Sequence, residues 1–289
     1  MALDEQQWPA GLYVVGTPIG NLADLSARAA ETLRRARLVA AEDTRTARRL
    51  LDHVGSRAPT VSLTEHNVEA RVPALLSEAR QGIAALVSEA GTPLVSDPGA
   101  RLVAAAHDAG VRVVPVPGPS ALTAALSVSG FEASDVRFLG FLPKQPGRLA
   151  AHLREAATGA RVLVFFERAN RLPRSLTAVA EAFGDPLVVV CREMTKLHEE
   201  VARGPASALA GRFARAKGEC TVVVSLPARA RAAADDSARA VLAAMRRAGA
   251  RRSAAAAEVA RLFGVSRQRA YEWWEETEDE QPAPTGELC

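Results

Sequence analysis

The sequence predicts two α/β domains followed by a small helical domain of the helix-turn-helix kind. The chain has 289 residues, which is enough for two domains of about 150 residues each. Short β-branched runs alternate with longer stretches rich in Ala, Leu and Arg, and a Gly/Pro-rich break at 129–146 divides them into two series. Apolar runs without polar alternation are typical of strands buried on both faces of a mainly parallel sheet. Two such domains leave a cleft between them, the usual place for a ligand.

The first α/β domain is predicted over residues 11–129. Its strands are expected at Leu12–Val15, Leu38–Ala41, Thr60–Leu63, Ile83–Val87 and Val111–Val114. Its helices are expected near residues 24–36, 44–54, 67–80 and 100–109. Strands and helices therefore alternate, as they do in successive βα units.

The second α/β domain is predicted over residues 130–226, beyond the break. Its strands are expected at Arg161–Phe166, Leu187–Arg192 and Glu219–Leu226. Its helices are expected near residues 147–157, 171–183 and 205–214. The pattern again indicates a buried sheet covered by helices.

The C-terminal part begins with a linker at 227–237, which is rich in Ala but has no clear apolar stripe. A helical domain follows at 238–276, and residues 277–289 form an acidic, Pro-containing tail. Within the helical domain, Gly264 can end one helix and Ser266 can cap the next. Three short helices are expected, near residues 238–248, 253–263 and 266–276.

Apolar side chains on both sides of that turn fit the core of a small helix-turn-helix. They are Ala256, Val259, Ala260, Tyr271 and Trp274. Three arginines, Arg261, Arg267 and Arg269, are expected outside this core. A helical hairpin that only packs on its neighbour fits the same pattern equally well.

Composition excludes several classes of protein. Hydrophobic residues make up 48% and charged residues 24%, which excludes a largely disordered chain. No run approaches the roughly 18 apolar residues of a membrane span, and the N-terminus has no apolar signal region. The three cysteines and five histidines form no ligand-spaced cluster, so we expect a reduced cytoplasm and no structural metal. The net charge of +3 conceals a more basic body, because the acidic run 275–280 offsets it.

Three loops that follow predicted strands have an unusual composition rich in Gly, Pro and small polar residues. They are residues 16–21 (GTPIGN), 88–99 (SEAGTPLVSDPG) and 116–121 (VPGPSA). None is a GxGxxG dinucleotide fingerprint or a phosphate loop. In an open α/β sheet, ligands bind beyond the carboxyl ends of the strands, so rigid loops there suit a flat ligand held by backbone groups. Each loop taken singly also fits a plain turn.

Charged side chains gather at several other strand ends. The groups are Glu42-Asp43-Thr44-Arg45, Glu167-Arg168, Arg192 to Lys196 with Glu199, and Lys217-Gly218-Glu219. Such residues are commonly a solvated rim, and Asp43 fits equally well as the cap of the helix at 44–54.

The loops and charged groups together match one family in order along the chain. The matching segments are 13–22 (YVVGTPIGNL), 41–45 (AEDTR), 89–99 (EAGTPLVSDPG), 117–120 (PGPS), 140–143 (GFLP), 192–196 (REMTK) and 217–219 (KGE). On these motifs the chain resembles the ribosomal RNA small-subunit methyltransferase I family, of the tetrapyrrole methylase superfamily. The resemblance covers about residues 11–226, and the helical tail matches more loosely.

The resemblance implies a two-domain tetrapyrrole-methylase fold, usually dimeric, with the cofactor S-adenosyl-L-methionine in the cleft between the domains. It also implies methylation of the 2′-hydroxyl of a cytidine in the decoding region of 16S rRNA. The partner would then be 16S rRNA or the small ribosomal subunit, with no membrane involved. Carried over residue by residue, the cofactor contacts are Gly91, Thr92, Pro93, Val95, Ser120, Ala121, Phe166 and Met194.

Three positions depart from the pattern of the family. Gly16 stands where the family commonly has Pro, Glu89 where it has Asp, and Leu139 where it has Glu. Leu139 argues against a catalytic acid just before Gly140. We assign no role to Glu89.

A ribose hydroxyl is a poor nucleophile, so its methylation benefits from a base and from a cation that stabilises the developing alkoxide. The base candidates are Asp43, Glu193 and Glu199. Arg45 and Lys196 are expected to stabilise the oxygen or to bind flanking phosphates. These roles rest on strand-end position and motif membership alone.

The tail is expected to position the RNA. Arg261, Arg267 and Arg269 supply cations, and Trp273 and Trp274 supply surfaces for base stacking. Two other functions remain open, a tetrapyrrole C-methyltransferase and a non-catalytic RNA-binding or assembly protein. A dinucleotide oxidoreductase is disfavoured because no GxGxxG follows the first strand.

Overall fold

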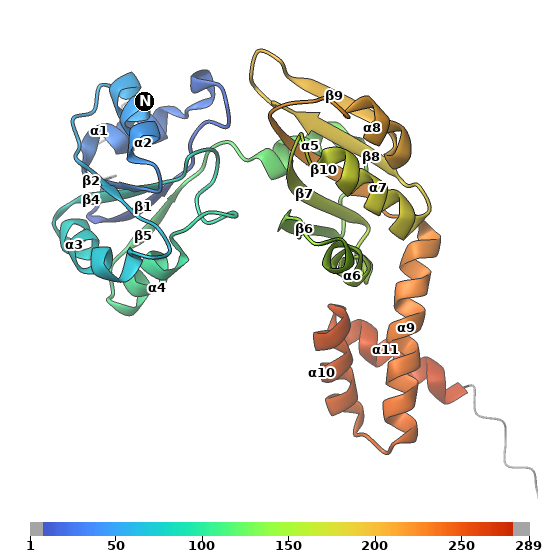
Figure 1. The fold of residues 1–289 in the computed structure, drawn as a ribbon. Helices are drawn as coiled ribbons and strands as arrows, with labels where there is room; N and C mark the ends of the chain where they lie inside the picture. Colours follow the sequence, from blue (N-terminus) through green and yellow to red (C-terminus); the bar gives the residue numbers. More distant parts are fainter. Residues whose placement is uncertain (1–7, 280–289) are drawn as a thin grey trace, which may run out of the picture. The chain divides into compact units, whose positions relative to one another are not determined.

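The computed structural model describes residues 8–279, and for 228–234 and 277–279 it describes the backbone alone. The chain forms two compact units (Figure 1). The first unit joins the chain up to Ser127 with the separate segment Cys191–Glu200. The second joins Val128–Val190 with the chain from Val201 onward.

The first unit is built on a five-stranded sheet in the order β3-β2-β4-β1-β5. Its strands are β1 (Gly11–Val15), β2 (Ala36–Ala41), β3 (Thr60–Ser62), β4 (Ile83–Val87) and β5 (Val113–Val116). All four pairings between neighbouring strands are parallel. The expectation of a parallel sheet is confirmed for this unit, although β5 lies two residues later than predicted.

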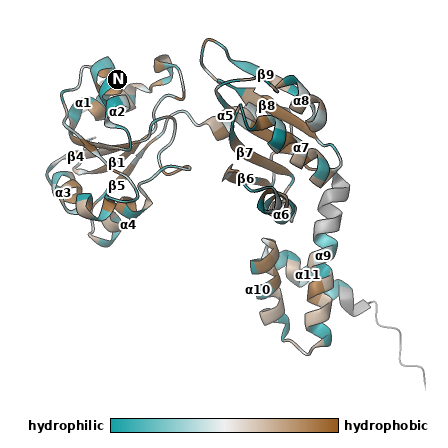
Figure 2. Cartoon of the chain, in the orientation of Figure 1, coloured by the Kyte–Doolittle hydropathy of each residue, from teal (hydrophilic) through white to brown (hydrophobic). Residues whose placement is uncertain are grey.

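Helices cover both faces of this sheet. They are α1 (Ala27–Arg35), α2 (Thr44–Val54), α3 (Val68–Gln81) and α4 (Ala100–Asp108), with a short 3-10 helix at Leu22–Asp24. Along β4, alternate residues enter different cores: Ala85 packs with α1 and α2, whereas Leu86 packs with α3 and α4. All five residues of β4 are buried, and Figure 2 shows the strands as apolar bands between helices with polar outer faces.

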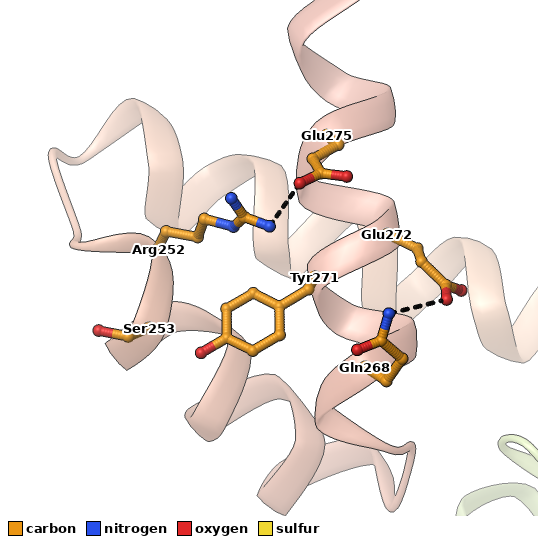
Figure 3. A pocket seen from close by; sticks show the side chains of 6 residues that line it. All are labelled: Arg252, Ser253, Gln268, Tyr271, Glu272 and Glu275. Atoms are coloured by element: carbon orange, nitrogen blue, oxygen red, sulfur yellow. Dashed lines mark hydrogen bonds and ion pairs between the residues drawn. The ribbon is translucent and has the colours of Figure 1, made fainter.

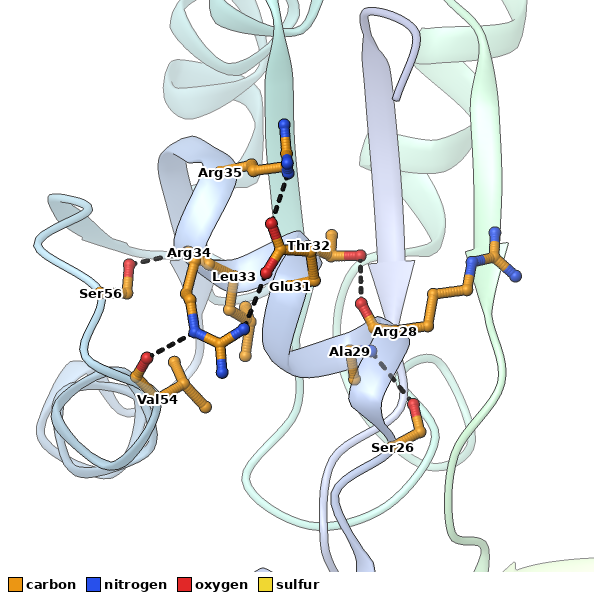
Figure 4. Close-up of polar contacts among 10 residues, drawn as sticks. All are labelled: Ser26, Arg28, Ala29, Glu31, Thr32, Leu33, Arg34, Arg35, Val54 and Ser56. Carbon is orange, nitrogen blue, oxygen red and sulfur yellow. Dashed lines mark hydrogen bonds and ion pairs between the residues drawn. The ribbon is translucent and has the colours of Figure 1, made fainter. Parts of the chain in front are cut away.

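Polar contacts at their carboxyl ends fasten α1 to α2 (Figure 4). Arg34 donates through Nε to the carbonyl of Val54 at 2.9 Å, and Ser56 donates through Oγ to the carbonyl of Leu33 at 2.6 Å. Both acceptors belong to the last turns of helices, which have no intrahelical partner for their carbonyls. At the other end of α1, the Ser26 side chain accepts from the amide of Ala29 and caps the helix.

The second unit contains a mixed five-stranded sheet in the order β6-β7-β10-β8-β9. Its strands are β6 (Val136–Phe141), β7 (Val162–Arg168), β8 (Leu187–Arg192), β9 (Glu200–Pro205) and β10 (Glu219–Ser225). The helices α6 (Pro146–Ala157), α7 (Leu172–Phe183) and α8 (Ala206–Arg212) accompany it, and α5 (Ala121–Ser129) spans the division between the units. Strand β7 pairs in parallel with β6 and antiparallel with β10.

Two strands of this sheet, β6 and β9, were not predicted. Both lie at its edges, where one side of a strand has no neighbour and a long apolar run is not required. Strand β6 falls inside the segment that was read as a Gly/Pro-rich break, and β9 has the polar sequence EVARGP.

A buried ion pair holds the turn after β6. Glu167, whose side chain is fully buried, accepts from Ser175 Oγ at 2.6 Å and lies 3.4 Å from the guanidinium of Arg171. Arg171 in turn donates to the carbonyls of Leu142 and Pro143, at 3.0 and 3.5 Å. Arg171 thus holds the turn at 142–143, and the buried carboxylate of Glu167 holds Arg171 in place.

The C-terminal part consists of α9 (Ala228–Arg247), α10 (Arg252–Phe263) and α11 (Arg267–Asp279). The segment 227–237 was expected to be a linker. In the structure α9 begins at Ala228, so nearly all of this segment is helical. The three helices share an apolar core of their own, and Gly264 ends α10 in the left-handed region with φ 64°. The predicted helix-turn-helix arrangement of α10 and α11 is thus present. Of the predicted acidic tail 277–289, residues 280–289 lie outside the described residues.

Candidate functional site

The three loops that composition singled out all follow strands of the first sheet, at its carboxyl edge. Residues 16–21 follow β1, residues 88–99 follow β4 and residues 117–120 follow β5. Because β1 pairs directly with both β4 and β5, the sheet itself brings the starts of the loops together. This edge is where ligands bind in open α/β sheets.

The loops after β1 and β4 are joined by their backbones. Thr17 donates its amide to the carbonyl of Gly91 at 2.8 Å, and Gly91 donates its amide to the carbonyl of Thr17 at 3.1 Å. The buried hydroxyl of Thr17 and the hydroxyl of Ser88 both donate to the same carbonyl of Gly91, at 3.2 and 3.0 Å. The carbonyl of Gly91 is therefore fixed by three donors.

The loop after β5 meets both of the others. A Cβ atom placed on Gly16 would lie 2.8 Å from the backbone nitrogen and Cα of Gly118, so neither residue can carry a side chain without a shift. The Thr92 hydroxyl donates to the carbonyl of Pro119 at 3.2 Å. All three loops thus converge in one junction, which we call the loop junction (16–21, 88–99 and 117–120).

The loop junction contains most of the predicted cofactor contacts. Gly91 and Pro93 are buried, and Thr92, Val95 and Ser120 are partly exposed. Ala121, the first residue of α5, follows directly and is also partly exposed. Met194 lies in the segment Cys191–Glu200, which groups with the same unit. Phe166 belongs to β7 in the second unit, where its ring contacts those of Phe138 and Phe141, with centroids 4.9 and 5.7 Å apart.

The segment 191–200 packs against the loop after β1. A Cβ on Gly20 would lie 2.5 Å from Cγ of Lys196 and 2.8 Å from Oγ1 of Thr195. The Thr195 Oγ1 atom is buried and has no hydrogen-bond partner within residues 8–279. An unpaired buried hydroxyl is costly unless a ligand or water completes it. Together with the closely packed glycines, it fits a site that binds its ligand largely through backbone and small polar groups.

Two of the predicted catalytic acids in this segment have fixed partners. Glu193 accepts from Nζ of Lys196 at 3.0 Å. Glu199 accepts from the amide of Thr195 at 3.1 Å. Both Glu193 (φ 48°) and Thr195 (φ 67°) adopt the left-handed region that non-glycine residues rarely occupy, a kind of strain that clusters at functional sites.

Asp43 and Arg45 form a pair at the start of α2. Asp43 caps the helix by accepting from the amide of Arg45 at 2.7 Å, and its second oxygen contacts the guanidinium at 2.9 Å. These bonds to Arg45 lower the pKa of Asp43 from 3.8 to about 2. Both interpretations left open by the sequence therefore apply in part, because Asp43 is the helix cap and also orients Arg45.

Asp97 is a further residue of this site, and the sequence assigned no role to it. Its carboxylate is half-buried in the loop after β4. Burial, and then the negative charges of Glu42 and Glu89, raise the pKa of Asp97 from 3.8 to about 6. Nearby Leu94 (φ 72°) and Ser96 (φ 67°) are both left-handed. The sequence showed that Asp97 belongs to a family motif, but not that the carboxylate is shielded from water.

The arginines predicted to bind RNA are exposed, but two of them are paired. Arg261 forms an ion pair with Glu258 one turn earlier, and Arg269 contacts Asp235 of α9 at 2.6 Å. Arg267 is exposed at the first position of α11.

The prediction that the tail tryptophans offer stacking surfaces is wrong. Trp273 and Trp274 are only 3% and 7% exposed and lie in the core of the three helices. Their ring faces are also occupied, since Arg269 lies 5.3 Å from the Trp273 ring and Arg246 lies 5.2 Å from the Trp274 ring. They follow Ala270 at the spacing of one helix face, which is the pattern of a core.

One open pocket of about 490 Å³ lies on the tail, between α10 and α11 (Figure 3). Its walls are polar. Arg252 of α10 is bonded to Glu275 of α11, and Gln268 is bonded to Glu272 within α11. The charged and amide groups of this pocket are thus bonded to one another, and they form no catalytic constellation. Among the described residues no group of three His, Cys, Asp or Glu side chains is placed to hold a metal ion, and no helix could cross a membrane.

Comparison with known proteins identifies a family and relatives of the chain. Residues 11–210 match the family of tetrapyrrole (corrin/porphyrin) methylases. A ribosomal RNA small subunit methyltransferase I of Mesorhizobium japonicum is 48% identical over 226 residues, 76% of this chain and 76% of the relative. The protein of that name in Thermotoga maritima is 45% identical over 217 residues, 74% of this chain and 97% of the relative.

Solved structures with this fold are more distant in sequence. A uroporphyrin-III C-methyltransferase from Thermus thermophilus, complexed with S-adenyl homocysteine, is 19% identical with a TM-score of 0.55. The similarity covers 74% of this chain and 97% of the other. A cobalt precorrin-4 methyltransferase aligns with a TM-score of 0.55 at 17% identity, over 74% of this chain and 94% of the other. At these identities the similarity shows the fold alone.

Proposed function

The chain belongs to the ribosomal RNA small subunit methyltransferase I family of the tetrapyrrole methylases, and from that premise we propose that it methylates a cytidine of 16S rRNA on its ribose 2′-hydroxyl. The methylated nucleotide would lie in the decoding region. The family consists of S-adenosyl-L-methionine-dependent methyltransferases, and this cofactor supplies a methyl group on a positively charged sulfur.

The convergence of the three loops is the observation that supports this proposal most directly. The loop junction brings Gly91, Thr92 and Ser120 into one locality through hydrogen bonds among its own loops, and Ala121 follows Ser120 directly. Positioning of two reactants can account for about 7–11 kcal/mol of a reaction barrier. A junction whose loops are tied to one another has the rigidity that such positioning requires.

The charged residues of the site are proposed to act as two oriented cations. Asp43 orients Arg45, and Glu193 orients Lys196, through the contacts described above. Arg45 and Lys196 would then stabilise negative charge on the acceptor oxygen or bind flanking phosphates. Glu199 supports this arrangement by fixing the amide of Thr195.

Replacement of each acid tests these roles. Alanine at Asp43, Glu193 or Glu199 is expected to leave cofactor affinity in place and to lower methyl transfer at saturating cofactor. Unchanged turnover in all three variants would refute a part for these acids in the reaction.

We propose that the helical tail positions the RNA, with Arg267 as its principal cation and Arg261 and Arg269 as paired contributors. Structured RNA is bound largely through its shape and its phosphates, which suits exposed arginines better than the buried tryptophans. We also propose that the protein acts as a homodimer in the cytoplasm, and light scattering of the purified protein tests its oligomeric state.

The decisive experiment maps 2′-O-methylation along 16S rRNA from cells with and without this protein. Loss of one modified cytidine in the decoding region, restored by the cloned gene, is the expected result. An unchanged map would overturn the proposed substrate. Calorimetry with S-adenosyl-L-methionine separates an enzyme from a non-catalytic RNA-binding protein, and transfer of label to a tetrapyrrole instead of RNA would indicate a C-methyltransferase.

A further inference from the structure

Asp97 differs from the three predicted base candidates in having no bonded partner among the described residues. It differs from Glu42 and Glu89 in being half-buried, because both of those side chains are exposed. Within residues 8–279 its carboxylate makes no hydrogen bond and no ion pair, although it is half-buried. The loop that carries it is fixed at Gly91 by Thr17 and at Thr92 by Pro119. Asp97 thus belongs to the loop junction, in the part of residues 88–99 that follows these contacts, and no described residue engages its carboxylate oxygens.

The acids that the sequence favoured as bases are all engaged. Asp43 accepts from the amide and the guanidinium of Arg45, Glu193 accepts from Lys196, and Glu199 accepts from a backbone amide. For Asp43 these bonds lower the pKa to about 2, so this carboxylate binds a proton weakly.

The charges around Asp97 have the opposite effect. Glu42, just after β2, and Glu89, in the same loop as Asp97, are the charged groups that act on it, and Glu89 also interacts with Arg45. Their repulsion and the burial bring the pKa of Asp97 to about 6. A general base works best when its pKa lies near the operating pH.

We propose that Asp97 is the group that accepts the proton of the acceptor hydroxyl during methyl transfer, an inference that rests on the proposed function. The hydroxyl oxygen forms a bond to the methyl carbon while the bond between that carbon and sulfur breaks and its electron pair remains on sulfur. The hydroxyl proton passes to the Asp97 carboxylate, which later releases it to water. Charge balances, because the sulfonium loses its positive charge and one proton is produced.

The test is the pH profile of kcat for methyl transfer to 16S rRNA at saturating S-adenosyl-L-methionine. For the unaltered protein kcat is expected to rise with pH and to level off above about 6, the pKa of Asp97. Asp97→Asn is expected to lower the plateau by about 10²- to 10⁴-fold, the usual contribution of a general base. Its residual activity should lack the acidic limb of the profile.

Two further readouts separate a chemical role from a structural one. Calorimetric affinity for S-adenosyl-L-methionine and the melting temperature are expected to be undiminished in Asp97→Asn. Glu42→Gln removes one charge that repels the Asp97 carboxylate, so the pKa of Asp97 should fall. The acidic limb of the kcat profile of this variant should move to lower pH, while its plateau value of kcat stays the same. Asp108→Asn, at the far end of α4, serves as the matched control and should leave the profile in place.

The outcomes distinguish this inference from the proposed function. If the unaltered protein methylates the RNA and Asp97→Asn keeps kcat within about threefold, or keeps the acidic limb, the role of Asp97 is overturned while the function stands. If the unaltered protein transfers no methyl group to RNA, the proposed function is overturned and the role of Asp97 with it.

Discussion

Thr17 and Gly91 exchange two backbone hydrogen bonds, of 2.8 and 3.1 Å, across 74 positions of the chain. The two backbone bonds resemble one residue pair of a β-ladder between the two loops. The Thr17 hydroxyl adds a third bond to the same Gly91 carbonyl. Gly91 has φ 85°, a conformation that L side chains rarely adopt. Contacts between backbone atoms therefore determine the geometry of the site. Replacing a closely packed glycine by a larger residue is the most direct test of this conclusion.

Gly118→Ala is expected to disrupt the loop junction. The new Cβ would lie 2.7 Å from the carbonyl oxygen of Gly16, a backbone atom that cannot move aside cheaply. We expect affinity for S-adenosyl-L-methionine, measured by calorimetry, to fall at least about tenfold, because small displacements of positioning groups have large effects. Gly211→Ala is the control, since nothing lies within 4 Å of its Cβ and its helical position favours Ala. Equal affinities in the two variants would contradict a backbone-built site.

Asp97→Asn is expected to stabilise the protein, but only above a certain pH. The folded pKa of about 6 lies above the ordinary value of 3.8, so the folded state binds more protons between these values and stability falls as pH rises through them. Removing the charge should therefore raise the free energy of unfolding above pH 6, by on the order of 1 kcal/mol after allowance for solvent screening. Below pH 3.8 the difference should vanish. Denaturant titrations at pH 4 and pH 8 measure it.

Glu167→Gln is expected to destabilise the second unit strongly. The change leaves the Arg171 guanidinium without its buried counter-charge and weakens its hold on the turn at 142–143. Breaking a buried pair in this way costs about 3–5 kcal/mol at most, and we expect about 2–3 because Arg171 is partly exposed. Glu132→Gln, which removes an exposed partner of Arg161, should cost less than about 1 kcal/mol. Chemical denaturation compares the two.

Arg267→Ala is expected to weaken RNA binding and its dependence on salt. Each phosphate contact contributes about 0.7–0.9 to the slope of log affinity against log salt concentration, so the slope should fall by roughly that amount. Arg80→Ala, an exposed arginine near the end of α3, is the control and should leave the slope as it was. An equal decrease of the salt slope in Arg267→Ala and Arg80→Ala would argue against a special role for the C-terminal helices in RNA binding. Filter binding at several salt concentrations gives the slopes.

Asp43→Ala is expected to lower the melting temperature, whereas Asp43→Asn is not. Asn retains the ability to cap α2 but loses the charge that orients Arg45. The stabilisation that accompanies the low pKa of Asp43 is present above pH 3.8 and is lost as pH falls through about 2. Reduced turnover in Asp43→Asn with an unchanged melting temperature would identify the pairing with Arg45 as functional.

Much of the fold follows from the sequence because the central strands are continuous apolar runs. Strand β4, buried throughout, was predicted with its exact bounds, and so was α2, which begins after a capping Asp43 and ends at the left-handed Gly55. The edge strands β6 and β9 were missed because a half-solvated strand needs no such run. The α9 helix was missed in its first half because Ala and Arg form helices without an apolar stripe.

The site could be predicted only in part, for a different reason. The three loops were identified because Gly and Pro in unusual density are visible in a sequence, and their convergence follows from the order of the parallel strands. Burial of a single polar side chain has no comparable signal. Asp97 thus looked like any acid in a loop, and Trp273 like an exposed aromatic residue, until the packing of their neighbours was known.

Arg137 of the edge strand β6 reaches the turn between α10 and α11. Its guanidinium donates to the carbonyl of Gly264 at 3.2 Å and to the carbonyl of Glu155 at 3.3 Å, and it fills the space that a side chain at position 264 would need. The three C-terminal helices are therefore held by the bond from Arg137 to Gly264 as well as by their covalent connection through α9. A different helical module grafted onto the same sheet would keep this contact if it presented a backbone carbonyl to Arg137 at the same turn, which is most readily done with a glycine in the left-handed region.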